Sequence, residues 1–248
     1  MKSYLMTDVG LKRPSNQDAF CQATLPDVQF AVVCDGMGGH QGGNVASELA
    51  VSAFHEMLSS RLHGGLRTKE WKNLISGIIA RVSLLIADTA AATPDLAGMG
   101  STVVMAVRIG EKMCIAHVGD SRCYLFRKGK LRRLTKDHSL VQELIDRKEI
   151  SPEEGENHPG RNVITRALGY QDESLADVVF SDVKKGDVYL LCTDGLTVPV
   201  SDSELQEILQ ITPPDRLAEV LVDKALAGGG PDNITVGILW EESEAKNQ

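Results

Sequence analysis

An excess of positive charge is missing from this chain. Among its 248 residues, 26 Lys and Arg stand against 34 Asp and Glu, which gives a formal net charge of −8 and a pI near 5.3. The longest basic stretch, at 127–133, is short and is expected to be a solvated hairpin. Binding to nucleic acid or to an anionic membrane surface generally needs more positive charge than this. We therefore expect no nucleic-acid partner.

Long apolar runs and paired cysteines are also lacking. The amino terminus has no apolar core of signal-peptide length, and no run is expected to approach the roughly 18 apolar residues that cross a bilayer. The five cysteines are odd in number, lack Cys-x-x-Cys spacing and mostly lie in apolar segments, so we expect reduced core thiols. These features predict a cytoplasmic protein without a membrane span.

Apolar segments rich in valine and isoleucine recur along the chain, and Gly, Asp and Lys turns separate them. This pattern predicts antiparallel sheets. The segments lie at 28–34, 101–109, 113–118, 122–126, 177–181, 187–192 and 234–240. Hairpin turns are expected at 108–113, 126–131 and 183–188.

Helices are expected in two pairs. Apolar residues at helical spacing predict the first pair at 44–58 and 71–91. In the second pair, a capping box begins one helix at Ser201, and the other covers 214–227, from a proline pair to a glycine run. Two pairs of helices among two groups of strands predict an α+β fold, a four-layer αββα sandwich whose two central antiparallel sheets carry a helix pair on each outer face.

A single domain is expected over 1–241, with a frayed tail at 242–248. One segment within it, 139–161, has a different composition: a short amphipathic helix is followed by an acidic, poorly apolar stretch. Such segments commonly vary and move, so this one is a candidate for substrate selection, with a plain connector as the alternative.

Five aspartates, each close to Gly, Ser or Asn, carry the chemistry of this sequence. They are Asp18, Asp35, Asp120, Asp194 and Asp232. Four of them adjoin an apolar segment, so we expect them at strand ends, where a sheet holds a carboxylate rigidly at the edge of a cleft. Taken singly, each could be an ordinary turn residue. As a set they predict a site for magnesium, manganese or calcium rather than zinc, because these ions prefer oxygen ligands.

The segments around these aspartates resemble a known family. They read RPSNQD at 13–18, VCDGMGGH at 33–40, GST at 100–102, VGDSR at 118–122, LTKDHS at 134–139, NVITRALG at 162–169, CTDG at 192–195 and PDN at 231–233. In this order they are similar to the metal-dependent serine/threonine protein phosphatases of type 2C, in the compact bacterial form. The resemblance implies the αββα fold and a protein phosphatase with two Mn²⁺ or Mg²⁺ ions, in which water or hydroxide bridging the ions attacks phosphoserine or phosphothreonine directly.

The resemblance also implies roles for the metal ligands. Asp35 would bridge both ions, and Asp194 and Asp232 would complete the first. The carbonyl of Gly36 would bind the second ion, since a glycine lets backbone oxygen approach closely. A weaker third ion would lie between Asp120 and Asp194. In the same family 139–161 is the flap beside the active site.

Further residues would act around the ions. Asp18 would orient a metal-bound water, Asn233 would support the neighbouring ligand, and Arg13 would clamp the substrate phosphate with two parallel hydrogen bonds. The proton donor for the leaving group is open. Met37 stands where eukaryotic relatives carry a histidine; His40 is a weak candidate, with helix-start packing or proton donation by water as the alternatives.

Two other functions remain open from the residues. The first is a non-catalytic phosphoprotein-binding module of the same fold, for which missing ligands would be the usual sign. The second is a phosphatase for small phosphate esters. The expected partners are phosphorylated proteins, with a serine/threonine kinase opposing the enzyme, and the chain is expected to act as a monomer.

Overall fold

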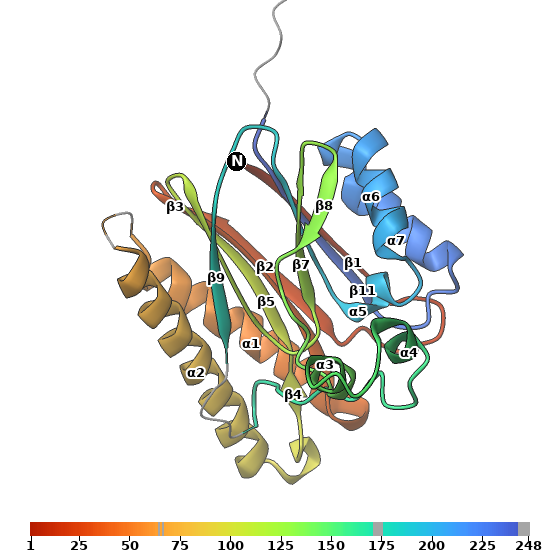
Figure 1. The fold of residues 1–248 in the computed structure, drawn as a ribbon. Helices are drawn as coiled ribbons and strands as arrows, with labels where there is room; N and C mark the ends of the chain where they lie inside the picture. Colours follow the sequence, from red (N-terminus) through yellow and green to blue (C-terminus); the bar gives the residue numbers. More distant parts are fainter. Residues whose placement is uncertain (64, 66, 171–175, 243–248) are drawn as a thin grey trace, which may run out of the picture.

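The computed structural model describes residues 1–63, 65, 67–170 and 176–242. Within these residues, two antiparallel sheets form the centre of the molecule (Figure 1). The first sheet has the order β1 (Lys2–Asp8), β11 (Ile234–Trp240), β10 (Val188–Cys192), β7 (Arg122–Arg127) and β8 (Lys130–Arg133). The second has the order β2 (Asp18–Thr24), β3 (Val28–Met37), β5 (Val103–Ile109), β6 (Lys112–Val118) and β9 (Asp177–Asp182), and the short β4 (Gly100–Ser101) pairs with the end of β3. The tail expected at 242–248 lies outside the described residues except for Glu242.

Strand β10 shows why the apolar segments are nearly continuous. Its five residues are all buried. Leu190 and Cys192 belong to the cluster beneath the helices, whereas Tyr189 and Leu191 belong to the cluster between the two sheets. A strand covered on both faces needs apolar side chains at every position. The predicted layering therefore follows from the unbroken apolar runs.

Each sheet carries helices on its outer face. Helices α1 (Gly39–Arg61) and α2 (Thr68–Ala92) cover the second sheet, and α6 (Asp202–Ile211) and α7 (Leu217–Ala227) cover the first, as Figure 1 shows. Three short helical turns complete these regions: η1 (Pro94–Leu96), α5 (Asp194–Thr197) and η2 (Pro214–Arg216). The four-layer αββα sandwich is confirmed.

Helix α2 corrects one expectation. By length and composition alone, it is the one helix among the described residues that is long and apolar enough to cross a membrane. The expectation that no segment reaches this length is therefore wrong. In the structure, Trp71, Ile75 and Ile79 are buried in the cluster that α2 shares with α1 and the second sheet. Packing against the sheet accounts for the apolar face of α2.

The hairpin expected at 183–188 is also wrong. Strand β9 pairs with β6 in the second sheet, whereas β10 pairs with β7 and β11 in the first. The turn therefore connects the two sheets. The turns at 108–113 and 126–131 do join paired strands, β5 to β6 and β7 to β8.

The flap segment leaves and returns at one point beside the sheets. It contains α3 (Leu140–Asp146), as predicted, and a second short helix, α4 (Pro152–Glu156), which the acidic composition had concealed. Leu140 N donates to Val163 O at 2.9 Å, and Thr165 N donates to His138 O at 2.8 Å. These backbone hydrogen bonds hold the two ends of the flap together.

Candidate metal centre

Asp35 and Asp18 lie opposite each other on neighbouring strands. Asp18 begins β2, and its register partner on β3 is Asp35. The sequence predicted Asp35 at a strand end. In the structure Gly36 and Met37 continue β3 beyond it and pair with β4. Its backbone N donates to Thr102 Oγ1 at 3.0 Å, and its carbonyl accepts from Thr102 N at 2.8 Å. The paired backbone holds both carboxylates in place.

The side chain of Asp18 has one satisfied and one orphaned oxygen. Oδ2 accepts hydrogen bonds from Thr193 Oγ1 at 2.9 Å and from Thr235 Oγ1 at 2.7 Å. Oδ1 is buried and has no protein partner. Buried carboxylate oxygens are normally hydrogen-bonded or bound to a cation. This oxygen therefore fits a site that takes an ion or the water of an ion.

The other three aspartates approach from loops at the ends of strands. Asp120 follows β6, Asp194 begins α5 directly after β10, and Asp232 precedes β11. Hydrogen bonds place two of their segments beside Asp18: Thr193, next to Asp194, donates to Asp18, and Asn233, next to Asp232, accepts from Gln17 N. The charges of all four other aspartates raise the pKa of Asp35. The structure thus brings together all five aspartates predicted from the sequence.

Burial makes this cluster costly without a cation. The pKa values of three of the aspartates are raised, and burial is the largest cause for each. The pKa is about 6 for Asp120, about 7 for Asp18 and about 8 for Asp194. The pKa of Asp35 is raised well above its usual range, first by burial and then by Asp18 and Asp194. Neighbouring negative charges favour the neutral form of each carboxyl group. Divalent cations bound among the carboxylates would favour their ionised form and so lower these pKa values.

The donor set fits Mg²⁺ or Mn²⁺, because it consists of carboxylate oxygens with a backbone carbonyl at Gly36. A Cβ added to Gly36 would stand 1.9 Å from Gly43 O, so no other residue fits between β3 and α1. Among the described residues, the only three ligand atoms within 4.8 Å of one another belong to His117, His138 and Asp177, so no three of the aspartates meet that spacing in this structure.

Asn233 organises the loops around Asp232. Its Oδ1 accepts from Gln17 N at 2.8 Å, and its Nδ2 donates to Val9 O and Ser15 O at 2.9 Å each. The side chain thus joins the loop between β1 and β2 to the start of β11. The supporting position predicted for Asn233 agrees with these contacts.

Arg13 lies on the same loop and forms an ion pair with Asp232. Its Nη2 lies 2.7 Å from Asp232 Oδ2, and the side chain of Arg13 is 51% exposed. The hydrogen bond to Asp232 is the largest cause that raises the pKa of Arg13. Arg13 is therefore beside the aspartate cluster, where a phosphate clamp is expected, but in this structure it binds a carboxylate.

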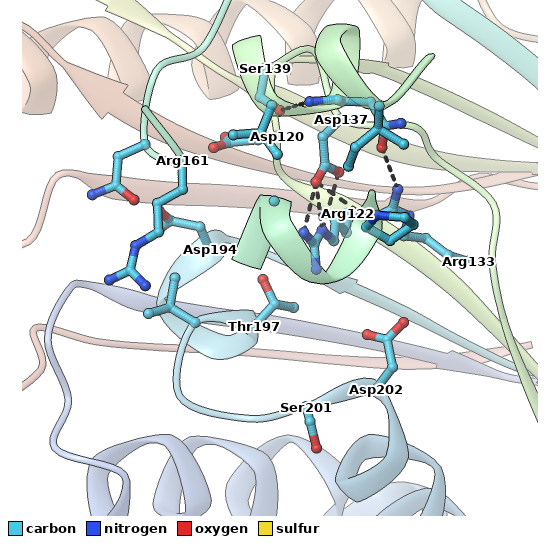
Figure 2. Close-up of a pocket in the computed structure, with 17 residues that line it drawn as sticks. Asp120, Arg122, Arg133, Asp137, Ser139, Arg161, Asp194, Thr197, Ser201 and Asp202 are labelled. Carbon is cyan, nitrogen blue, oxygen red and sulfur yellow. Dashed lines mark hydrogen bonds and ion pairs between the residues drawn. The ribbon is translucent and has the colours of Figure 1, made fainter. Parts of the chain in front are cut away.

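A cavity of about 740 Å³ opens between the aspartate cluster and the flap. Figure 2 shows Asp120 and Asp194 among its lining residues, together with Arg122 and Asp137, which are paired with each other. Arg122 donates from Nε to both oxygens of Asp137 at 3.1 Å and from Nη2 to Oδ2 at 2.7 Å. This pair fixes the segment before the flap to the loop that carries Asp120. No local sequence pattern identified Asp137 as the partner of Arg122.

His117 and His138 form a buried stack next to this segment, with ring centroids 4.6 Å apart. His117 Nε2 lies 2.7 Å from Lys136 O, and His138 Nδ1 accepts from Gly119 N at 3.2 Å. Burial lowers the pKa of His138 to about 4. Both rings thus engage backbone groups, and His138 Nε2 also lies 3.4 Å from Asp177 Oδ2.

The remaining candidate, His40, lies in the first turn of α1. Its side chain is outside the described part of the structure. Met37, which precedes it, ends β3.

The threonines that hold Asp18, Thr193 and Thr235, were not found from the sequence. Thr193 directly precedes Asp194, which is a weak signal for such a role.

Comparison with known proteins agrees with this fold and identifies the family. A family model described as protein phosphatase 2C matches residues 12–224. The chain belongs to this family.

Two curated relatives are similar over nearly the whole chain. The chain is 40% identical to the serine/threonine phosphatase stp of Listeria monocytogenes, over 250 residues that cover 100% of this chain and 99% of the relative. It is 39% identical to the serine/threonine protein phosphatase PstP of Mycobacterium tuberculosis over 93% of this chain but only 43% of that protein, so it spans less than half of that relative.

A solved structure of the catalytic domain of the serine/threonine protein phosphatase PstP in complex with two manganese ions is 36% identical. It superposes with a TM-score of 0.82 over 96% of each chain.

Proposed function

We propose that this chain is a protein phosphatase that depends on Mn²⁺ or Mg²⁺ and hydrolyses phosphoserine and phosphothreonine in proteins. The observation that carries the proposal is the convergence of five aspartates, four of them with pKa values raised by burial, at one end of the two sheets. Such a cluster is unfavourable unless cations complete it. The named activity of the relatives and the two manganese ions of the PstP structure support the same reading.

Four residues would hold the two ions of the core site: Asp35, Asp194 and Asp232 through their carboxylates, and Gly36 through its carbonyl. Asp120 with Asp194 would hold a weaker third ion. When bound, the ions would lower the pKa of a water and supply positive charge beside the phosphoryl oxygens, as in other two-metal sites.

The protein groups bind, orient and hold protons around this centre. Arg13 has a guanidinium with several N–H donors, about half of it exposed to solvent, which suits binding of two phosphate oxygens. Asp18 presents its unpartnered Oδ1 as an acceptor for a water, while Thr193 and Thr235 hold its other oxygen. Asn233 positions Asp232 through the loops it connects.

The leaving alkoxide needs a proton, and Met37 cannot supply one. His40 stays a prediction as the donor, with a water as the alternative. We further propose that the substrates are phosphoproteins made by an opposing serine/threonine kinase, and that the protein acts as a monomer in the cytoplasm, where its five free cysteines stay reduced.

The test is hydrolysis of a phosphothreonine peptide with Mn²⁺. We expect the activity to disappear in chelator and Asp35→Asn to lower kcat at least about 100-fold, the scale of losing a group that stabilises transition-state charge. Asp27→Asn, an exposed aspartate in the turn before β3, is the matched control and should retain activity. Robust hydrolysis in chelator would contradict the proposal. Tight phosphopeptide binding without turnover would indicate a binding module, and faster turnover of small esters than of peptides would indicate a metabolite phosphatase.

A further inference from the structure

The loops that carry Arg13 and Asp232 are joined through their backbones. Leu11 N donates to Gly230 O at 2.9 Å. Gly10 lies so close that an added Cβ would stand 2.1 Å from the carbonyl oxygen of Asp232, and its φ of +75° also favours glycine. The two charged side chains are thus held next to each other by the fold, rather than meeting by chance as two mobile surface groups.

Both oxygens of the Asp232 carboxylate are engaged. Oδ1 accepts from Asn233 N at 2.8 Å, and Oδ2 accepts from Arg13 Nη2 at 2.7 Å. The Asn233 contact is local to the backbone and compatible with ligation through the other oxygen. Oδ2 is therefore the oxygen that a cation would take, and Arg13 occupies it.

This ion pair is easily exchanged. Arg13 is 51% exposed and Asp232 is 30% exposed, so water screens their attraction. Exposed pairs of this kind shift an equilibrium by only about two- to fivefold. The guanidinium also lies in the field of Asp194 and Asp35, which raise its pKa after Asp232 does. Arg13 thus supplies some of the positive charge that the carboxylates need.

We propose that Arg13 occupies the Asp232 ligand position until a divalent cation and a phosphate group displace it together. A cation on Asp232 Oδ2 releases the guanidinium, which is then free to donate to a phosphate oxygen. A phosphate on Arg13 in turn releases Asp232 for the cation. Because linked equilibria are reciprocal, each ligand strengthens the binding of the other. This inference rests on the proposed metal-dependent function and adds a coupling between cation and substrate that the ligand set alone does not contain.

The experiment measures Mn²⁺ binding to the whole chain by calorimetry, without turnover. In phosphate-free buffer, Arg13→Gln should bind the first Mn²⁺ about two- to fivefold more tightly than the wild type. Lys12→Gln removes one positive charge from the adjacent, exposed position and is the matched control. It should leave the Mn²⁺ affinity unchanged. Saturating inorganic phosphate should tighten Mn²⁺ binding more in the wild type than in Arg13→Gln.

A second readout follows the guanidinium itself. In protein with ¹⁵N-labelled arginine, the side-chain signal that Arg13→Gln removes should shift when diamagnetic Mg²⁺ binds. An unchanged Arg13 signal, or equal Mn²⁺ affinity in Arg13→Gln and wild type, would overturn the inference. So would equal tightening in Lys12→Gln, since that would show a general effect of charge. Mn²⁺ binding with the expected Arg13 response but no phosphopeptide hydrolysis would instead overturn the proposed function alone.

Discussion

In chelator, the folded chain should become less stable as the pH rises from 5 to 7. The carboxyl groups of Asp18 and Asp194 have pKa values of about 7 and about 8 in the folded chain, against an ordinary value of 3.8. From about pH 4 upward, the unfolded chain releases protons that the folded chain retains. The free energy of unfolding therefore falls as the pH rises, until the folded groups ionise as well.

The size of the effect follows from the number of retained protons. One proton held only by the folded chain lowers the free energy of unfolding by about 1.4 kcal/mol per pH unit. Asp18, Asp194 and the more strongly shifted Asp35 interact with one another, so we count one net proton for the cluster as a lower bound. Between pH 5 and pH 7 the loss is then about 2.7 kcal/mol, which lowers the melting temperature of a chain of this length by about 5–11 °C.

Thermal unfolding followed by circular dichroism at constant ionic strength measures this slope. Saturating Mg²⁺ should flatten it, because bound cations stabilise the ionised carboxylates. Asp194→Asn should reduce the slope in chelator, whereas Asp27→Asn, on the exposed turn before β3, should leave it unchanged. A melting temperature that is constant or rises between pH 5 and pH 7 in chelator would refute the reasoning.

Three substitutions test other parts of the structure by denaturant unfolding. Gly36→Ala should cost at least about 3 kcal/mol, because the new Cβ meets backbone oxygen at 1.9 Å; a loss below 1 kcal/mol would mean that β3 and α1 separate easily. Arg127→Met should lower the free energy of unfolding by about 3–5 kcal/mol, because it leaves the fully buried carboxylate of Asp187 without its ion pair. Arg216→Met, at an exposed pair, is the control and should cost less than about 1 kcal/mol. Equal losses in the two variants would contradict this. Ser201→Ala removes the capping box of α6 and should cost about 1 kcal/mol, and an unchanged stability would show that the cap contributes nothing.

Most of the strands that could be predicted from the sequence are covered on both faces; the edge strand β9, in which no residue is fully buried, is an exception. The interior strands have nearly continuous apolar runs, which composition reveals directly. Strands β1 and β2 were missed because they combine apolar with polar and exposed residues; in β1 only Leu5 is fully buried. The turn at 183–188 was misread for a different reason. Local turn chemistry is the same whether the next strand pairs with the last one or crosses to another sheet, and only long-range packing decides between them.

The aspartates of the candidate site could be found because each lies in a recognisable short segment. Their neighbours could not. Asp18 depends on Thr193 and Thr235, which follow it by 175 and 217 positions, and no local pattern marks such partners. The ion pair of Arg13 with Asp232 is equally remote, at a separation of 219 positions. Short local segments thus reveal the candidate metal ligands, and only the fold reveals the residues that hold them in place.

The pairing of β1 with β11 also bears on how the protein is made. In the first sheet β11 lies between β1 and β10, so the earliest of the described strands pairs with the latest. A chain still short of residue 234 leaves an edge of β10 exposed and β1 without its partner, and exposed strand edges invite pairing with other chains. Asp232 joins the other aspartates only when this strand is in place. A chain that ends before residue 234 is therefore expected to lack the complete candidate metal site and to aggregate more readily than a chain that contains β11.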